Sequence, residues 1–284
     1  MNYRLCPQVT FAEQLEDLRD AWKWCHQHLE GLVGDGNIDL ARSVIGGESA
    51  GGTFATLSGF ILEPRPSVVI NLYGPVLLSH PHFHVPADNL EEALASLQYS
   101  QPRTTEELEA ALRDNDPARA RSRFPWWPDL DVPPEKLRTF LGLPDYTVGE
   151  EERLRMDLYK YMSVRRNRFS TVFRRHTLSP EDFQKTLNLF SALELIKSAS
   201  KFPPTFFVHG TADNAAPIGP SQAMFDQLKT KGVPVGARWV EGADHSFDVF
   251  ITVGFNCPST LTVRDQTRRA GKTSLPVPTL RIAL

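Results

Sequence analysis

The stretch Gly46-Gly47-Glu48-Ser49-Ala50-Gly51-Gly52 is the part of the sequence that decides the fold. An apolar run at 43–47 precedes it and a helical pattern at 50–59 follows it, so we expect a strand, a sharp turn and a helix. A serine hydroxyl is a poor nucleophile unless it is exposed, held in position and paired with a base. The Gly-x-Ser-x-Gly turn supplies that geometry between a strand and a helix. Ser49 is therefore the predicted nucleophile.

The segments around this turn predict further parallel strands. Apolar residues at steps of three and four indicate an amphipathic helix at 11–29, and a β-branched run bounded by Pro66 and Gly74 indicates a strand at 67–73. Helices that alternate with strands in this way are typical of βαβ units in a parallel sheet. The same pattern returns near the C-terminus, with strands expected at 205–209 and 237–241 and a helix between them at 220–231.

A mostly helical insertion is expected between the two groups of strands. We expect its helices at 88–98, 105–113, 135–141, 150–168 and 180–198, with Asp88, Thr104 and Ser179 as N-caps. The predicted organisation is an α/β core at 1–74 and 205–250, a helical cap at 75–204, and an irregular tail at 251–284. The fold class is α/β, with a mainly parallel sheet and a helical cap insertion.

Two further residues follow Ser49 in the order that a catalytic triad needs. Asp213 lies in the loop after the strand at 205–209, and His245 lies in the loop after the strand at 237–241. Open α/β sheets place their sites at the carboxyl ends of their strands. His245 is the predicted general base toward Ser49, and Asp213 is predicted to fix its tautomer. Taken singly, each is equally well explained as an ordinary turn aspartate or a surface histidine.

The chain resembles the α/β-hydrolase fold-3 family, the hormone-sensitive-lipase-like esterases. The matching stretches are Tyr3-Arg4-Leu5-Cys6-Pro7, Gly46–Gly52, His209-Gly210-Thr211-Ala212-Asp213 with Pro217 and Ser221, and Gly242-Ala243-Asp244-His245-Ser246-Phe247. The resemblance implies a serine hydrolase that acts on the carboxylic ester of a small-molecule acyl substrate, without a cofactor or metal. It also implies an acyl-enzyme on Ser49 and an oxyanion donor at the backbone amide of Ala50.

The sequence departs from this family at both ends. Family members carry a His-Gly-Gly loop, which completes the oxyanion hole, and three strands before the segment that corresponds to Tyr3–Pro7. We therefore expect an N-terminally truncated hydrolase, or a fragment of one, with an atypical C-terminus. Loss of one oxyanion donor typically costs ~10²–10³ in rate. We also expect the strand that contains Val44 and Ile45 to present an unpaired apolar edge.

Composition excludes some other classes of protein. A net charge of −3 over 284 residues gives no electrostatic footprint for nucleic acid. No apolar run approaches the ~20 residues that span a bilayer. The three cysteines are few and far apart, which favours reduced thiols and a cytoplasmic protein.

Several alternatives stay open at this point. His80, His82 and His84 alternate along the chain and could suggest a metal site, although no companion ligand is spaced for zinc. Trp126 and Trp127 are candidates for an acyl pocket or for packing of the insertion. A basic run is interpreted as a solvated helix face and comprises Arg165, Arg166, Arg168, Arg174 and Arg175. The alternative functions are a catalytically impaired relative that binds a small molecule, and an interaction protein that acts through the cap. An amide substrate is also compatible with the same residues.

Overall fold

The structure is a computed structural model that describes all residues except 35, 87, 123–148 and 251–284. Met1–His245 forms one compact unit, and Ser246–Leu284 forms a second. Within the second unit, the described part is a short 3₁₀ helix at Phe247–Phe250. The expected helix at 135–141, the Trp126-Trp127 loop and the expected tail at 251–284 lie outside the described residues.

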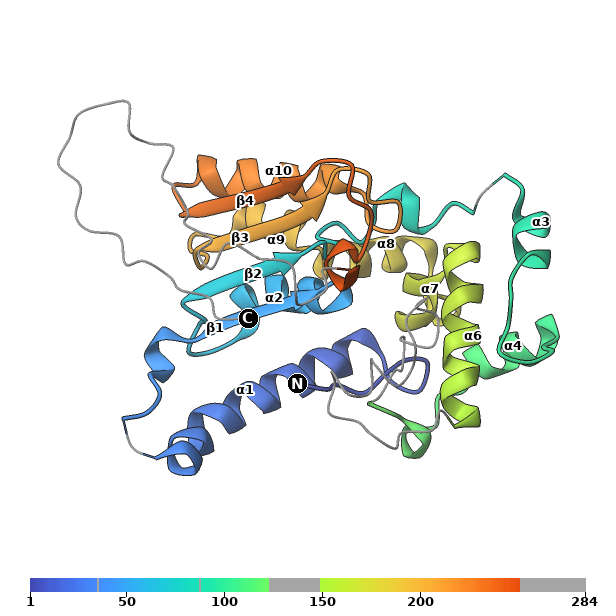
Figure 1. The fold of residues 1–284 in the computed structure, drawn as a ribbon, viewed down its shortest axis with the longest axis horizontal. Coiled ribbons are helices and arrows are strands. Elements are labelled where there is room, and N and C mark those ends of the chain that lie inside the picture. The colour runs from blue at the N-terminus through green and yellow to red at the C-terminus, as the bar shows by residue number, and fades with distance from the viewer. Residues whose placement is uncertain (35, 87, 123–148, 251–284) are drawn as a thin grey trace. The chain divides into compact units, whose positions relative to one another are not determined.

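Four parallel strands form the sheet of the described chain (Figure 1). They are β1 (Val44–Glu48), β2 (Val68–Leu72), β3 (Thr205–Gly210) and β4 (Val235–Val240), in the spatial order β1-β2-β3-β4. The prediction of a parallel α/β sheet is confirmed, and each strand lies within two residues of its expected position. In the described residues β1 pairs with β2 alone, and Val44 is 43% exposed, so β1 is the edge strand that the sequence predicts.

The helices that follow or precede the strands pack against one face of this sheet. They are α1 (Phe11–Val33), α2 (Ala50–Ile61), α9 (Ala192–Ser198) and α10 (Ile218–Thr230). Thr10 begins α1 with a reciprocal capping box to Glu13, and Gly34 ends it. The strand residues on this face, such as Val69 and Phe207, are fully buried. Together with α7 and α8, described below, these elements enclose a large apolar cluster, here called the main core.

Figure 1 shows the other helices of the insertion between β2 and β3. They are α3 (Leu90–Ala95), α4 (Thr105–Leu112), α6 (Glu150–Arg165), α7 (Arg168–Val172) and α8 (Pro180–Leu189). The α7, α8 and α9 helices contribute side chains to the main core. The α3, α4 and α6 helices instead surround a separate small group of buried side chains, here called the outer cluster, which consists of Leu108, Leu158, Tyr161 and Met162.

Two helix boundaries differ from the sequence prediction. The helix expected at 180–198 is divided into α8 and α9 at Ser191. The Ser191 hydroxyl is fully buried, donates to the carbonyl of Leu187 at 2.6 Å and accepts the amide of Leu78 at 2.8 Å, so it ties the chain after β2 to this break. The helix expected at 150–168 ends at Arg165 because Arg166 adopts a left-handed conformation with φ of 54°. The predicted N-caps Thr104 and Ser179 are confirmed. Asp88 is not an N-cap, because α3 begins after Asn89.

The segment before α1 joins the sheet side to the insertion. Tyr3 packs edge-on against Phe54 of α2, with ring centroids 4.7 Å apart. Arg4 forms an ion pair with Asp17 of α1 at 2.7 Å. Arg155 of α6 is nearly buried and donates to the carbonyl of Cys6 at 2.8 Å. This segment therefore packs against helices, whereas β1 takes its described strand partner from β2.

Candidate active site

The turn between β1 and α2 holds Ser49 in a strained conformation. Ser49 has φ of 49° and ψ of −118°, which non-glycine residues rarely adopt, and its amide donates to the carbonyl of Leu72 at 2.9 Å. Close backbone contacts require glycine at positions 47 and 52, which flank Ser49. A Cβ on Gly47 would overlap the backbone of Gly51, and a Cβ on Gly52 would lie 2.9 Å from the Cα of Gly74. The turn is thus fixed by backbone contacts with β2.

The structure brings the three predicted residues together in one hydrogen-bonded chain. His245 Nε2 lies 2.9 Å from the hydroxyl of Ser49, and His245 Nδ1 lies 2.8 Å from Asp213 Oδ2. An ionised carboxylate can only accept, so Nδ1 carries the proton and Nε2 is left to accept from Ser49. The imidazole is therefore held in the tautomer that a general base toward Ser49 needs.

Asp213 lies in a fully buried and polar environment. Its side chain is 0% exposed, and Oδ1 accepts the amides of Ala215 at 2.9 Å and Ala216 at 2.8 Å. Burial alone would raise the pKa of this carboxyl. Hydrogen bonds from His209, from His245 and from the Ala216 amide outweigh burial and hold the pKa of Asp213 well below its usual range. The carboxylate is consequently ionised at neutral pH.

The loops that carry Asp213 and His245 are bound to each other. Asp244 accepts the backbone amide of Asn214 at 3.0 Å and its side-chain amide at 2.8 Å, and it also accepts the amide of His245 at 2.7 Å. A Cβ on Gly210 would overlap the carbonyl of Ala243, so the two loops approach too closely for a larger residue. The separation between acid and base is therefore fixed by local contacts as well as by the sheet.

Tyr73 supports the imidazole from the end of β2, a role that the sequence did not indicate. Its ring is fully buried and meets His245 edge-to-face, with centroids 4.8 Å apart and planes at 67°. Its hydroxyl donates to Glu48 at 2.9 Å, so Glu48, the residue before Ser49, anchors the ring. In the sequence Tyr73 is simply the expected last residue of a strand, and only the φ of 41° in the structure sets it apart.

The predicted oxyanion donor, Ala50, directly follows Ser49 at the start of α2. Ala50 is the first residue of α2, and the amides of a first helical turn have no intrahelical acceptor. These amides also form the positive end of the helix dipole, which favours negative charge beside Ser49. The role of Ala50 as an oxyanion donor stays a prediction.

The histidines at 80–84 are engaged in other contacts. His80 Nδ1 accepts the amide of His82, the ring of His82 accepts from Arg166, and His84 Nε2 contacts the carbonyl of Leu78 at 2.7 Å. In the part of the chain that the structure describes, no group of three or more His, Cys, Asp or Glu side chains is arranged to hold a metal ion. Nor is any helix of the described residues long and apolar enough to cross a membrane.

The basic run is not the single solvated helix face that the sequence suggests. It spans the end of α6, all of α7 and the turn after it, and its arginines are half-buried. Arg174 donates to the carbonyl of Gln8, and Arg175 donates to the carbonyl of Leu178 and lies over the ring of Phe183. Arg174 and Arg175 therefore make contacts within the chain instead of lying on a solvated helix face.

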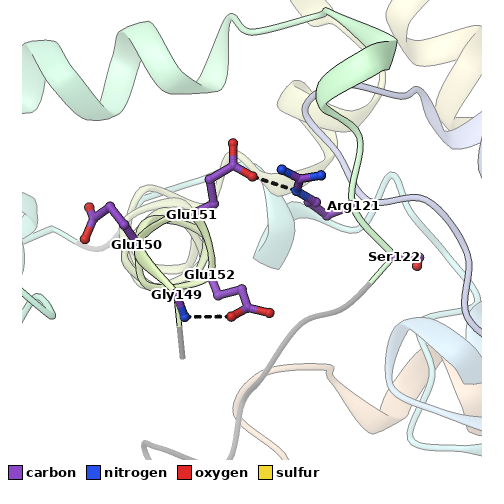
Figure 2. Close-up of a pocket in the computed structure, with 6 residues that line it drawn as sticks. All are labelled: Arg121, Ser122, Gly149, Glu150, Glu151 and Glu152. Atoms are coloured by element: carbon purple, nitrogen blue, oxygen red, sulfur yellow. Dashed lines mark hydrogen bonds and ion pairs between the residues drawn. The ribbon is translucent and has the colours of Figure 1, made fainter. Parts of the chain in front are cut away.

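A hollow on the surface of the insertion is separate from this site. Figure 2 shows its lining, formed by the N-terminal turn of α6 and the segment that ends at Ser122, with Arg121 paired to Glu151 at 2.6 Å. None of its lining residues belongs to the hydrogen-bonded chain of Ser49, His245 and Asp213. Its lining includes Glu150, Glu151 and Glu152 and one arginine, Arg121.

The parallel sheet and the serine at its strand–turn–helix junction are typical of the α/β-hydrolase fold. A family model described as alpha/beta hydrolase fold matches residues 1–134, and one described as the prolyl oligopeptidase family matches residues 146–250. The chain has the α/β-hydrolase fold, and the resemblance to the fold-3 family is confirmed over the residues matched.

Curated relatives include polyketide synthases that are about ten times as long as this chain. The non-reducing polyketide synthase Preu6 of Preussia isomera is 26% identical over 270 residues, which cover 88% of this chain and 11% of that protein. The non-reducing polyketide synthase adrD of Penicillium rubens is 25% identical over 258 residues, which cover 88% of this chain and 10% of that protein. The chain thus spans about a tenth of the length of these relatives.

The structure resembles solved hydrolases in its fold. A truncated form of a carbohydrate esterase from gut microbiota superposes with a TM-score of 0.51 at 13% identity, covering 89% of this chain and 68% of that one. At this identity the likeness concerns the fold and not the substrate.

Proposed function

We propose that this chain is a serine hydrolase that cleaves an ester-type acyl bond through an acyl-enzyme on Ser49. The observation that carries the proposal is the hydrogen-bonded chain from Ser49 through His245 to Asp213, with links of 2.9 and 2.8 Å. These are the distances at which a nucleophile and its base can exchange a proton.

The proposed reaction has two matched halves. His245 Nε2 takes the Ser49 hydroxyl proton while Oγ bonds to the substrate carbonyl carbon, and the leaving group then departs with that proton. Water repeats the sequence: His245 takes its proton, its oxygen attacks the acyl carbon, and Ser49 Oγ leaves and is reprotonated. Asp213 stays ionised throughout and stabilises the imidazolium in each half.

The relatives suggest the kind of acyl group. Two of them are named as polyketide synthases, and the matched region covers most of this chain, so we propose a polyketide-type acyl group as the substrate. The bond cleaved is then an oxygen ester or a thioester, since the same serine attacks either carbonyl.

A serine-directed fluorophosphonate probe tests the proposal on the folded chain. We expect covalent labelling of the wild-type protein, no labelling of Ser49→Ala, and unchanged labelling of Ser198→Ala, a matched control at an exposed helix end. Hydrolysis of an aromatic acyl thioester and of its oxygen ester would then rank the two substrate classes. A folded wild-type chain that never labels contradicts the proposal and favours a relative that only binds a small molecule.

A further inference from the structure

His209, the last but one residue of β3, is a second histidine in contact with Asp213. It is 1% exposed, and its Nε2 lies 3.2 Å from Asp213 Oδ2, the same oxygen that His245 contacts at 2.8 Å. The sequence pattern included His209 only as part of the stretch that ends at Asp213. The proposed reaction does not use this ring, so its burial beside the carboxylate needs a separate explanation.

The contacts of His209 determine which of its nitrogens carries a proton. Nε2 also lies 2.9 Å from the carbonyl of Ala216, which can only accept, so Nε2 is a donor shared between that carbonyl and Asp213. Nδ1 lies 3.1 Å from the hydroxyl of Ser221 on α10, and this hydroxyl can accept from or donate to it. Ser221 is itself buried, so it fixes the orientation of the ring.

The consequence for Asp213 is a carboxylate whose two oxygens each receive two donors. The amides of Ala215 and Ala216 serve Oδ1, and the two imidazoles serve Oδ2. A buried carboxylate with fewer donors would protonate more readily and would turn more freely. The direction of the Asp213 pKa shift agrees, since the hydrogen bond from His209 is among the contacts that lower it.

We propose that His209, oriented by Ser221, is a positioning residue that keeps Asp213 ionised and aimed at His245. The inference rests on the proposed serine hydrolase function, because it concerns the acid of that triad. His209 does not touch the reacting atoms. It acts through Asp213, so its effect should appear in the protonation of the coupled Asp213–His245 pair rather than only in the overall rate.

Two amide substitutions at position 209 make a matched test. The nitrogen of Gln reaches about as far as Nε2 of histidine and can still donate to Asp213, whereas Asn is one bond shorter and reaches only the level of Nδ1. The rate of fluorophosphonate labelling is measured against pH for both variants, and thermal unfolding shows that each is folded. We expect His209→Asn to label about 10-fold more slowly, with the acid limb of the profile at higher pH. We expect His209→Gln to keep the wild-type limb.

The outcomes separate this inference from the proposed function. If the wild-type chain does not label, the proposed function fails before position 209 is tested. If the wild type labels and a folded His209→Asn keeps the wild-type acid limb, the role of His209 is overturned even when its rate falls. Should His209→Asn not fold, Ser221→Ala decides by the same criterion: a limb moved to higher pH supports the inference, and an unmoved limb overturns it.

Discussion

The main core and the outer cluster are held together by different forces. The main core joins the sheet to its helices through a large set of apolar side chains and through close contacts between glycine backbones. Among the residues that the structure describes, the outer cluster has four buried side chains, and an ion pair between Asp157 and Arg103 is buried next to Leu158 along α6. Asp157 of α6 is 0% exposed and accepts from Arg103 at 3.1 Å and from the amide of Ser100 at 2.7 Å.

The two regions should therefore lose stability in response to different kinds of substitution. Apolar burial and backbone contact tolerate little added volume, because interiors are close-packed. A buried ion pair is sensitive to the loss of one partner, because the remaining charge then loses its compensation. The turn that holds Ser49 belongs to the first kind of region, and the loop that joins α3 to α4 belongs to the second.

The largest expected effect comes from added volume at Gly47. Gly47→Ala places a Cβ within the backbone of Gly51, which has no flexible end to move aside, so we expect a loss of about 4–5 kcal/mol of stability. Urea unfolding of the purified chain measures the change. Gly51→Ala is the matched control in the same turn, because its Cβ meets nothing within 4 Å. As a helix residue it should be neutral or stabilising by up to about 1 kcal/mol. Equal stability of the two variants would contradict the role assigned to the Gly47 contact.

The next effect concerns the buried charge beside the outer cluster. Asp157→Ala leaves Arg103 with the exposed Glu150 as its remaining ion-pair partner, and it removes the acceptor of both the amide and the hydroxyl of Ser100, so we expect a loss of about 3 kcal/mol. Glu181→Ala breaks an exposed ion pair with Lys185 and should cost less than about 0.5 kcal/mol.

Amide hydrogen exchange shows which part of the chain Asp157→Ala destabilises. Amides of α4 and α6 should lose protection before those of β2 and β3, because the charge lies beside the outer cluster. Uniform loss of protection across the chain would show that the insertion and the sheet unfold as one unit. The main core and the outer cluster would then not differ in how they respond to substitution.

The sequence predicts the sheet better than it predicts the contacts around the site. Strand positions and the order of Ser49, Asp213 and His245 follow from local apolar runs and turn residues, which short-range physics determines. The division of α8 from α9 does not follow, because Ser191 ends the helix by binding Leu78, far away along the chain. A helical pattern carries no information about such a partner.

The supporting residues of the site were missed for the same reason. Tyr73 and His209 look like ordinary strand residues, and their roles come from neighbours that only the folded sheet provides. For Glu48 the sequence gives a weak indication of a supporting role, since it is a carboxylate beside a proposed nucleophile. Asp244 likewise precedes His245 directly, and a polar residue in such a loop is a reasonable candidate for a turn-fixing contact.

Helix caps give a smaller effect in both regions. Thr10 caps α1 of the main core, and Thr104 caps α4 beside the outer cluster, each in a capping box with a glutamate. We expect Thr10→Ala to cost about 1 kcal/mol and Thr104→Ala about half of that, because Thr104 is exposed and water can satisfy the amide that it frees. Chemical unfolding measures both. A larger loss for Thr104→Ala would place more of the stability in the insertion than its small cluster indicates.

The smallest expected effect concerns the ionisation of Tyr3 and Tyr161, which separates the effect of burial on a pKa from the effect of a neighbouring charge. Burial raises the pKa of Tyr3 to about 12, with a further contribution from Cys6. Burial also raises the pKa of Tyr161 to about 12, with a further contribution from its hydrogen bond to Glu109 at 2.7 Å. Both values exceed the ordinary pKa of about 10 for tyrosine, so their contribution to stability is complete below that pH and is lost as pH rises through about 12.

Phenolate absorbance against pH follows these two groups directly. Tyr3→Phe and Tyr161→Phe should each remove part of the late rise in absorbance, which assigns that rise to the two side chains. Glu109→Gln removes the carboxylate beside Tyr161, so the Tyr161 phenolate should form at a lower pH while the Tyr3 phenolate forms where it did before. If Glu109→Gln shifts neither rise, burial alone raises the pKa in both regions. Tyr161 in the outer cluster would then resemble Tyr3 at the main core. The contribution of charge to the outer cluster would be restricted to Asp157 and Arg103.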